Sequence, residues 1–170
     1  FCQSKKETMP RLMIGDPAPN FKLPNQEGEA VSLQSFEGKK TVVVYFYPKD
    51  ETPGCVKEAC AFRDQYEDFS EAGAEVIGIS ADSVNSHKLF ALSRRINFNL
   101  LSDAKNKTRK AYGVANDMLG LVPGRETFVI DKYGKIQFRF ASQSKINQHI
   151  DEALRVVKKL NGSLEEEDDF

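Results

Sequence analysis

The chain has 170 residues, with 24 basic and 25 acidic side chains and a formal net charge of −1. This length is enough for one domain to bury a full hydrophobic core. So balanced a charge leaves no electrostatic footprint for nucleic acid or for an anionic membrane, so we expect neither as a partner. The longest apolar run, residues 41–47, is far shorter than the roughly 20 residues of a membrane-spanning helix, and no signal peptide is apparent.

The three cysteines are too few and too unevenly spaced for a secreted disulfide framework. Cys55 and Cys60 lie close together, whereas Cys2 belongs to a polar N-terminal segment in which we expect a bystander thiol. This usage indicates redox or nucleophilic chemistry in a reducing compartment. We expect residues 1–10 to be flexible.

The first elements are a stiff, turn-rich entry over residues 15–19 and a short hairpin. The hairpin is predicted because apolar residues alternate on either side of residues 25–28. Residues 41–47 are continuously apolar and rich in β-branched and aromatic side chains, which is typical of a central strand covered on both faces.

A long amphipathic helix is predicted from Val56, because apolar side chains recur at helical spacing until Ala72 and Gly73 close it. Residues 75–80 form the next buried strand. Asp82 or Ser83 is expected to cap a second helix, which carries the following apolar residues: Leu89, Phe90 and Leu92.

The apolar run at residues 99–101 is short enough for another strand, and a helical stretch follows Ser102 and Asp103 and ends near Gly113. Residues 116–124 show no clear period and predict a loop about nine residues long that borders a site.

The last part of the chain predicts a strand over residues 125–130, a turn at 131–134 and a returning strand at 136–140. A helix over residues 146–160 follows, and residues 161–170 are expected to form a disordered acidic tail. Strands that alternate with helices and end in a hairpin predict an α/β fold, a three-layer sandwich in which helices flank a central mixed sheet.

Cys55 is the candidate nucleophile, because a Pro/Gly turn places it where a helix begins. A thiol there faces unpaired backbone N–H groups and the positive end of the helix dipole, and both favour the thiolate. A buried structural cysteine is the alternative, but the turn draws the sulfur away from the core.

Cys60 lies five residues further along the same predicted helix. Helix geometry places the two Cα atoms roughly 8.5 Å apart on different faces, whereas a disulfide tolerates at most about 7 Å. Two interpretations stay open: Cys60 is simply buried, or the first helical turns unwind in each cycle so that Cys60 reaches Cys55. First turns have few internal hydrogen bonds and melt easily.

A metal site is not expected, because the two cysteines have no second Cys/His pair, and His87 and His149 stand alone and are expected to be ordinary surface residues. We also expect no cofactor. A cysteine hydrolase would need a histidine base beside Cys55, and this alternative stays open. Thioredoxin-type oxidoreductases normally carry a C-x-x-C motif, which is absent here.

The pattern Pro48-x-x-x-Thr52-x-x-Cys55 matches a peroxiredoxin active site. The fuller run over residues 45–55, together with Cys60 and residues 61–64, closely resembles the peroxiredoxin Q family, also called bacterioferritin comigratory proteins. The resemblance continues to the last helix, over about residues 11–160, and it implies a thioredoxin-like fold.

The resemblance implies that Cys55 is the peroxidatic cysteine, which attacks a hydroperoxide and becomes a sulfenic acid. Cys60 would be the resolving cysteine, which forms an intramolecular disulfide with Cys55 that a thioredoxin-type dithiol then reduces. Arg125 would stabilise the Cys55 thiolate and orient the peroxide, Thr52 would hydrogen-bond a peroxide oxygen, and Pro48 would shield the pocket from water.

By the same resemblance we expect a monomeric thiol peroxidase that reduces hydrogen peroxide and organic hydroperoxides in antioxidant defence. The first methionine is Met9, which favours a processed plastid form over a cytoplasmic one. Two other functions remain open: a disulfide reductase of thioredoxin-like fold that uses the Cys55 and Cys60 pair, and a redox-sensing binding protein.

Overall fold

The computed structural model of the protein describes residues 11–117 and 119–162. The flexible segment expected over residues 1–10, Cys2 included, lies outside the described residues. So does the acidic tail, apart from Asn161 and Gly162, which form a turn after the last helix.

Five strands form the central sheet, in the spatial order β5, β4, β3, β8, β9. Their bounds are Thr41–Phe46 (β3), Ala74–Ser80 (β4), Asn99–Ser102 (β5), Glu126–Ile130 (β8) and Ile136–Ala141 (β9). Strands β3, β4 and β5 run parallel, and β8 is antiparallel to both of its neighbours. The predicted mixed sheet with a central strand after residue 40 is therefore confirmed.

Both faces of β3 are buried, which explains its unbroken apolar sequence. Val43 and Tyr45 belong to the core on one face of the sheet, and Val44 and Phe46 to the core on the other. The ring of Tyr45 stacks on Phe62 with 4.6 Å between ring centroids. Successive side chains of a strand point to opposite faces, so one short run supplies both cores.

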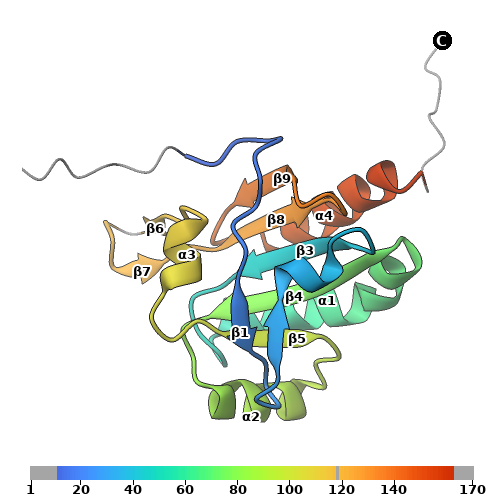
Figure 1. Ribbon diagram of the computed structural model, residues 1–170. Coiled ribbons are helices and arrows are strands. Elements are labelled where there is room, and N and C mark those ends of the chain that lie inside the picture. The colour runs from blue at the N-terminus through green and yellow to red at the C-terminus, as the bar shows by residue number, and fades with distance from the viewer. Residues whose placement is uncertain (1–10, 118, 163–170) are drawn as a thin grey trace, which may run out of the picture.

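Helices cover both sides of this sheet (Figure 1). Helices α1 (Pro53–Glu71) and α4 (Ile146–Leu160) pack on one face, and α2 (Val84–Arg94) lies along β5. The other face carries the predicted hairpin, β1 (Lys22–Pro24) and β2 (Ala30–Ser32), together with the short helices η1 (Leu33–Phe36) and α3 (Lys107–Ala111). The predicted three-layer, thioredoxin-like α/β sandwich is confirmed.

Several boundaries differ from the sequence predictions. Helix α1 begins at Pro53 rather than Val56, because proline fits the first helical position, where no N–H is needed. Of the two caps predicted for α2, the structure has Ser83, which accepts a hydrogen bond from the Ser86 amide at 3.1 Å. The predicted loop over residues 116–124 contains a small ribbon, in which β6 (Asn116–Asp117) pairs with β7 (Val122–Pro123).

The prediction that His87 and His149 are surface residues is wrong, because both are fully buried. Each lies on the inner face of its helix and bonds to groups that are remote in the sequence, Asp50 for His87 and Thr127 for His149. A buried imidazole needs hydrogen-bonding partners, and the residue pattern of one helix does not show whether remote segments supply them.

No described helix has the length and apolarity needed to cross a membrane.

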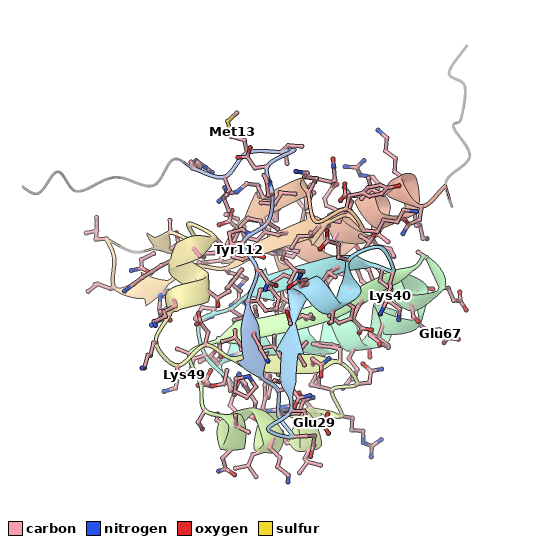
Figure 2. The ribbon with its side chains drawn as sticks, in the orientation of Figure 1. Met13, Glu29, Lys40, Lys49, Glu67 and Tyr112 are labelled. Carbon is pink, nitrogen blue, oxygen red and sulfur yellow. The ribbon has the colours of Figure 1, made fainter. Side chains whose placement is uncertain are left out.

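The end of β3 determines where the site lies. Lys40 and Lys49, which flank this strand, mark opposite ends of the sheet in Figure 2. Because β8 is antiparallel to β3, its first residue Glu126 pairs with Phe46, the last residue of β3. The loop that leads into α1 therefore meets the start of β8 at one end of the sheet.

Candidate active site

Cys55 is the third residue of α1 and is 1% exposed. The first helical hydrogen bond runs from the Val56 amide to the Thr52 carbonyl at 2.9 Å, so the amide of Cys55 precedes the helical ladder. Thr52 occupies the cap position, but its hydroxyl donates to the Lys49 carbonyl at 2.8 Å instead of capping the helix. The sulfur thus lies at the positive end of a 19-residue helix.

Arg125 joins the sulfur to a buried acid. Its Nη2 lies 3.4 Å from Cys55 Sγ, and its Nη1 donates to Glu58 Oε1 at 2.9 Å. Burial works to lower the pKa of Arg125, but the charges of Glu58 and Cys55 outweigh burial and raise the pKa. A fixed, water-excluded positive charge therefore faces the sulfur, which stabilises its thiolate form.

Gly54 allows this close contact. A Cβ atom at that position would lie 2.9 Å from Arg125 Nη2, closer than real Cβ contacts come. A side chain at this position would force the guanidinium to shift, so glycine lets Arg125 keep its place beside the helix start.

Glu58 is a site residue that the sequence prediction missed. It lies one helical turn after Cys55 and is fully buried, and this burial raises its pKa to about 7, although Arg125 opposes the shift. The signal available in the sequence was the i, i+3 spacing, which places Glu58 and Cys55 on the same face of α1.

His149 lies beside Glu58, with 3.8 Å between His149 Nδ1 and Glu58 Oε2. Its Nε2 donates to the Ser142 carbonyl at 2.7 Å, so Nδ1 accepts the Thr127 hydroxyl at 2.8 Å. Burial lowers the pKa of His149 to about 4, so the ring is neutral at neutral pH. The Ser142 amide in turn bonds to the carbonyl of Arg125 at 3.1 Å.

Neither histidine of the chain bonds to Cys55. Both lie in the described part of the protein, and their ring nitrogens are occupied by other groups. The cysteine hydrolase alternative therefore lacks its base.

Arg109, on α3, is a second buried guanidinium that the sequence prediction missed. It donates to the Tyr47 carbonyl at 3.0 Å and to the Gly124 carbonyl at 2.8 Å. These carbonyls immediately precede Pro48 and Arg125, so Arg109 ties together the two segments that meet at the site. No spacing rule relates Arg109 to either segment, which is why the sequence did not reveal it.

The predicted site residues are thus partly brought together. Cys55 and Arg125 are in contact, and Thr52 and Pro48 are half-buried in the loop that leads to Cys55. Cys60 is half-buried and lies further along α1, and both Cys55 and Cys60 are free thiols.

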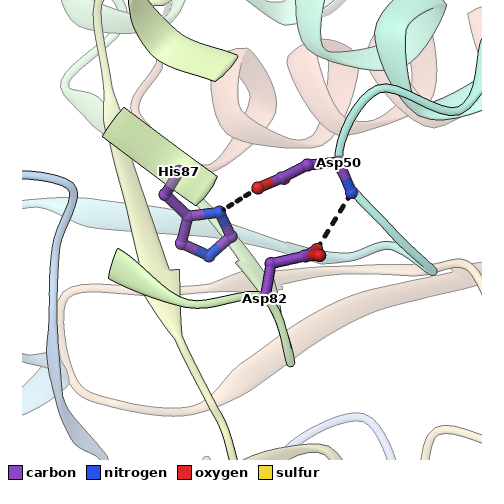
Figure 3. Close-up of side chains that lie close together, drawn as sticks. All are labelled: Asp50, Asp82 and His87. Carbon is purple, nitrogen blue, oxygen red and sulfur yellow. Dashed lines mark hydrogen bonds and ion pairs between the residues drawn. The ribbon is translucent and has the colours of Figure 1, made fainter. Parts of the chain in front are cut away.

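One group of side chains in the described residues has metal-ligand atoms within 4.8 Å of one another: Asp50, Asp82 and His87 (Figure 3). Asp50 Oδ2 faces His87 Nδ1 at 2.7 Å, and Asp82 Oδ2 accepts the Asp50 amide at 2.9 Å. These atoms are hydrogen-bonded to one another and to neighbouring groups, so the three residues form a connected polar network.

Comparison with known proteins finds similar proteins over most of the chain. The model of the AhpC/TSA family matches residues 14–139. Peroxiredoxin Q, chloroplastic, from Sedum lineare is 53% identical over 156 residues, which cover 92% of this chain and 83% of the relative. Peroxiredoxin Q, chloroplastic, from Oryza sativa subsp. japonica is 54% identical over 150 residues, covering 88% and 69%.

Among solved structures, the peroxidoxin BcpB of Mycobacterium tuberculosis superposes with a TM-score of 0.81 at 38% identity, and the match covers 88% of this chain and 99% of that one. Sequence and fold agree, and the buried thiol beside an arginine lies within the matched region. The chain therefore belongs to the AhpC/TSA family and, within it, to the peroxiredoxin Q group of thiol peroxidases.

Proposed function

We propose that Cys55 is the peroxidatic cysteine of this thiol peroxidase. Its thiolate attacks the terminal oxygen of a hydroperoxide, an S–O bond forms as the O–O bond breaks, and the leaving oxygen takes up a proton as water or alcohol. The observation that carries this proposal is the contact of 3.4 Å between Arg125 Nη2 and Cys55 Sγ at the start of α1. The same charge would stabilise the oxygen that departs.

Thr52 is proposed to bind the peroxide through its lone pairs. Its hydrogen is committed to the Lys49 carbonyl at 2.8 Å, so the oxygen is left as an acceptor for the O–H of the hydroperoxide. Pro48, half-buried in the same loop, offers no backbone donor and is proposed to keep water away from the thiolate.

Cys60 is proposed to resolve the sulfenic acid. Its thiolate attacks the Cys55 sulfur, an S–S bond forms, the S–O bond breaks, and hydroxide leaves and is protonated to water. Because an intact helix keeps the two sulfurs too far apart, the first turns of α1 must unwind for this step. Phe62 is fully buried against Tyr45, and Arg63 donates to the Arg94 carbonyl at 2.7 Å, which supports an unwound segment that ends before these residues.

A thioredoxin-type dithiol is proposed to reduce the disulfide, with hydrogen peroxide and organic hydroperoxides as substrates. We infer a plastid location from the two relatives described above, whose names are chloroplastic. Residues 11–160 are proposed to form the whole catalytic domain. An intramolecular resolving partner makes a second copy unnecessary for turnover, so we propose a monomer.

Two cysteine variants test the mechanism. Cys55→Ser should abolish thioredoxin-coupled consumption of hydrogen peroxide, and activity in this variant would exclude the proposed nucleophile. Cys60→Ser should consume one equivalent of peroxide and stop as the sulfenic acid, which a dimedone adduct detects by mass spectrometry. Full turnover of this variant with thioredoxin would remove Cys60 from the resolving role.

The same measurements distinguish the peroxidase from the two other functions that the sequence left open. A disulfide reductase would reduce a disulfide substrate but consume no peroxide in a single turnover. A redox sensor would react with one equivalent of peroxide and turn over slowly, while binding a partner in only one redox state. Steady-state rates with thioredoxin therefore distinguish the three functions.

A further inference from the structure

A buried polar network surrounds Asp50, which lies between Pro48 and Thr52 in the loop before Cys55. Its carboxylate accepts hydrogen bonds from the Tyr47 hydroxyl at 2.7 Å and from the Ser86 hydroxyl at 2.9 Å, and it faces His87 Nδ1 at 2.7 Å. The Asp50 amide donates to Asp82 Oδ2 at 2.9 Å. Asp50 is thus bonded to Tyr47, the residue after β3, to α2 and to the segment that follows β4. Figure 3 shows the last two of these connections, made through His87 and Asp82.

Each ring nitrogen of His87 has its own hydrogen-bonding partner. Nε2 lies 3.0 Å from the Leu101 carbonyl, which can only accept, so Nε2 carries a hydrogen. Nδ1 and Asp50 Oδ2 approach to 2.7 Å, so a proton lies between them. The side chains of His87 and Asp50 are 0% and 2% exposed, so water does not compete for this bond.

The residue after Asp50 needs this support. Glu51 has φ 63, the left-handed region that costs a non-glycine residue energy, and its side chain is held by Ser93 at 2.9 Å and Arg94 at 2.9 Å, both from α2. The loop is therefore kept in a strained conformation by contacts with α2. Of these contacts, the bond between Asp50 and His87 is the buried one.

We propose that Asp50 and His87 are positioning residues for peroxide reduction. Their bond fixes the loop that carries Pro48 and Thr52 and leads into the first turn of α1, and so sets where Thr52 and Cys55 meet the hydroperoxide. Neither side chain touches the sulfur. This inference rests on the proposed role of Cys55, and it goes further by assigning to α2 the support of the catalytic loop.

Two substitutions of His87 separate the two bonds of its ring. His87→Asn places an amide near the position of Nδ1 and keeps a donor for Asp50 while losing the Leu101 carbonyl. His87→Gln places its amide near Nε2 and keeps Leu101 while losing Asp50. Each loses one buried hydrogen bond, so both should be destabilised to a similar extent in thermal unfolding.

The measurement is the second-order rate of oxidation of the reduced protein by hydrogen peroxide, followed in a single turnover by stopped-flow fluorescence or by quenching and thiol counting. We expect His87→Gln to react about tenfold more slowly than the unchanged protein and His87→Asn to stay within about threefold, because small displacements of reacting groups are costly. Equal rates for the two variants, whether slow or fast, would overturn the positioning role, since loss of stability alone does not distinguish them.

A milder pair of variants covers the case in which His87→Gln does not fold. Ser86→Ala removes one donor to Asp50, whereas Asn85→Ala removes an exposed amide from the same helix. Ser86→Ala should react about threefold more slowly than Asn85→Ala, and equal rates would overturn the proposal. If the unchanged protein itself consumes no peroxide in a single turnover, the proposed function fails, whereas a reactive parent with indifferent variants refutes the positioning role alone.

Discussion

Glu58→Gln should make the stability of the protein less sensitive to pH. Burial raises the pKa of Glu58 to about 7 from its ordinary 4.5. An acid whose pKa is raised in the folded state contributes stability below its unfolded pKa, and this contribution is lost as the pH rises through the folded value. Glutamine has no such ionisation, and it keeps the oxygen that accepts from Arg125 Nη1.

Linkage gives the size of the effect. With a pKa of about 7 when folded and 4.5 when unfolded, the ionisation of Glu58 costs about 2 kcal/mol more at pH 8.5 than at pH 5.5. The free energy of unfolding of Glu58→Gln, measured relative to the unchanged protein, should therefore rise by about 2 kcal/mol between these two pH values.

Urea unfolding of the reduced proteins, followed by circular dichroism at both pH values, measures this difference. Glu67→Gln, which removes an exposed carboxylate from the same helix, is the matched control. If the stability difference between Glu58→Gln and the unchanged protein is the same at both pH values, Glu58 does not titrate in this range and the account of its burial is wrong.

Three further variants have defined outcomes. Gly54→Ala should push the guanidinium of Arg125 away from the sulfur, because the added Cβ would lie 2.9 Å from Nη2, and should slow single-turnover oxidation by about tenfold with little loss of stability. Arg109→Met should lower kcat/KM for hydrogen peroxide by a similar factor, because it releases the two carbonyls that precede Pro48 and Arg125; an unchanged value would show that these segments hold their places without it. Phe62→Ala should destabilise the protein by about 3–5 kcal/mol in chemical unfolding, because its fully buried ring stacks on Tyr45.

The elements of the fold that the sequence predicted are those with a strong local pattern. The unbroken apolar run after Lys40 identified the central strand, and the helix over residues 146–160 has the predicted bounds. The start of α1 was placed three residues late, because apolar periodicity begins only at Val56 while Pro53 already has helical geometry. Local patterns fix which elements exist more firmly than where they begin.

The candidate site was predictable only where one motif carried it. Cys55 lies within a single recognisable stretch, and Arg125 was found through the family pattern at a strand start. Glu58 and Arg109 were missed, because their importance comes from contacts made across 67 and 62 residues of sequence, with Arg125 and with the Tyr47 carbonyl. His87 was assigned to the surface for the same reason, since its partner Asp50 is 37 residues away.

The segment that contains Cys55 and Cys60 is held in place at both ends, and this affects how easily excess peroxide can overoxidise Cys55. Asp50 is held in the polar network before Cys55, and Phe62 is held in the core after Cys60. In the proposed resolving step the turns between them unwind, and the two sulfurs stay joined by a short tether, which would give Cys60 an effective concentration on the order of millimolar near Cys55. A second hydroperoxide must compete with this internal thiol to convert the sulfenic acid irreversibly to the sulfinic acid. We therefore expect the enzyme to resist overoxidation until the peroxide concentration is high enough for a second hydroperoxide to react with the sulfenic acid faster than Cys60 does.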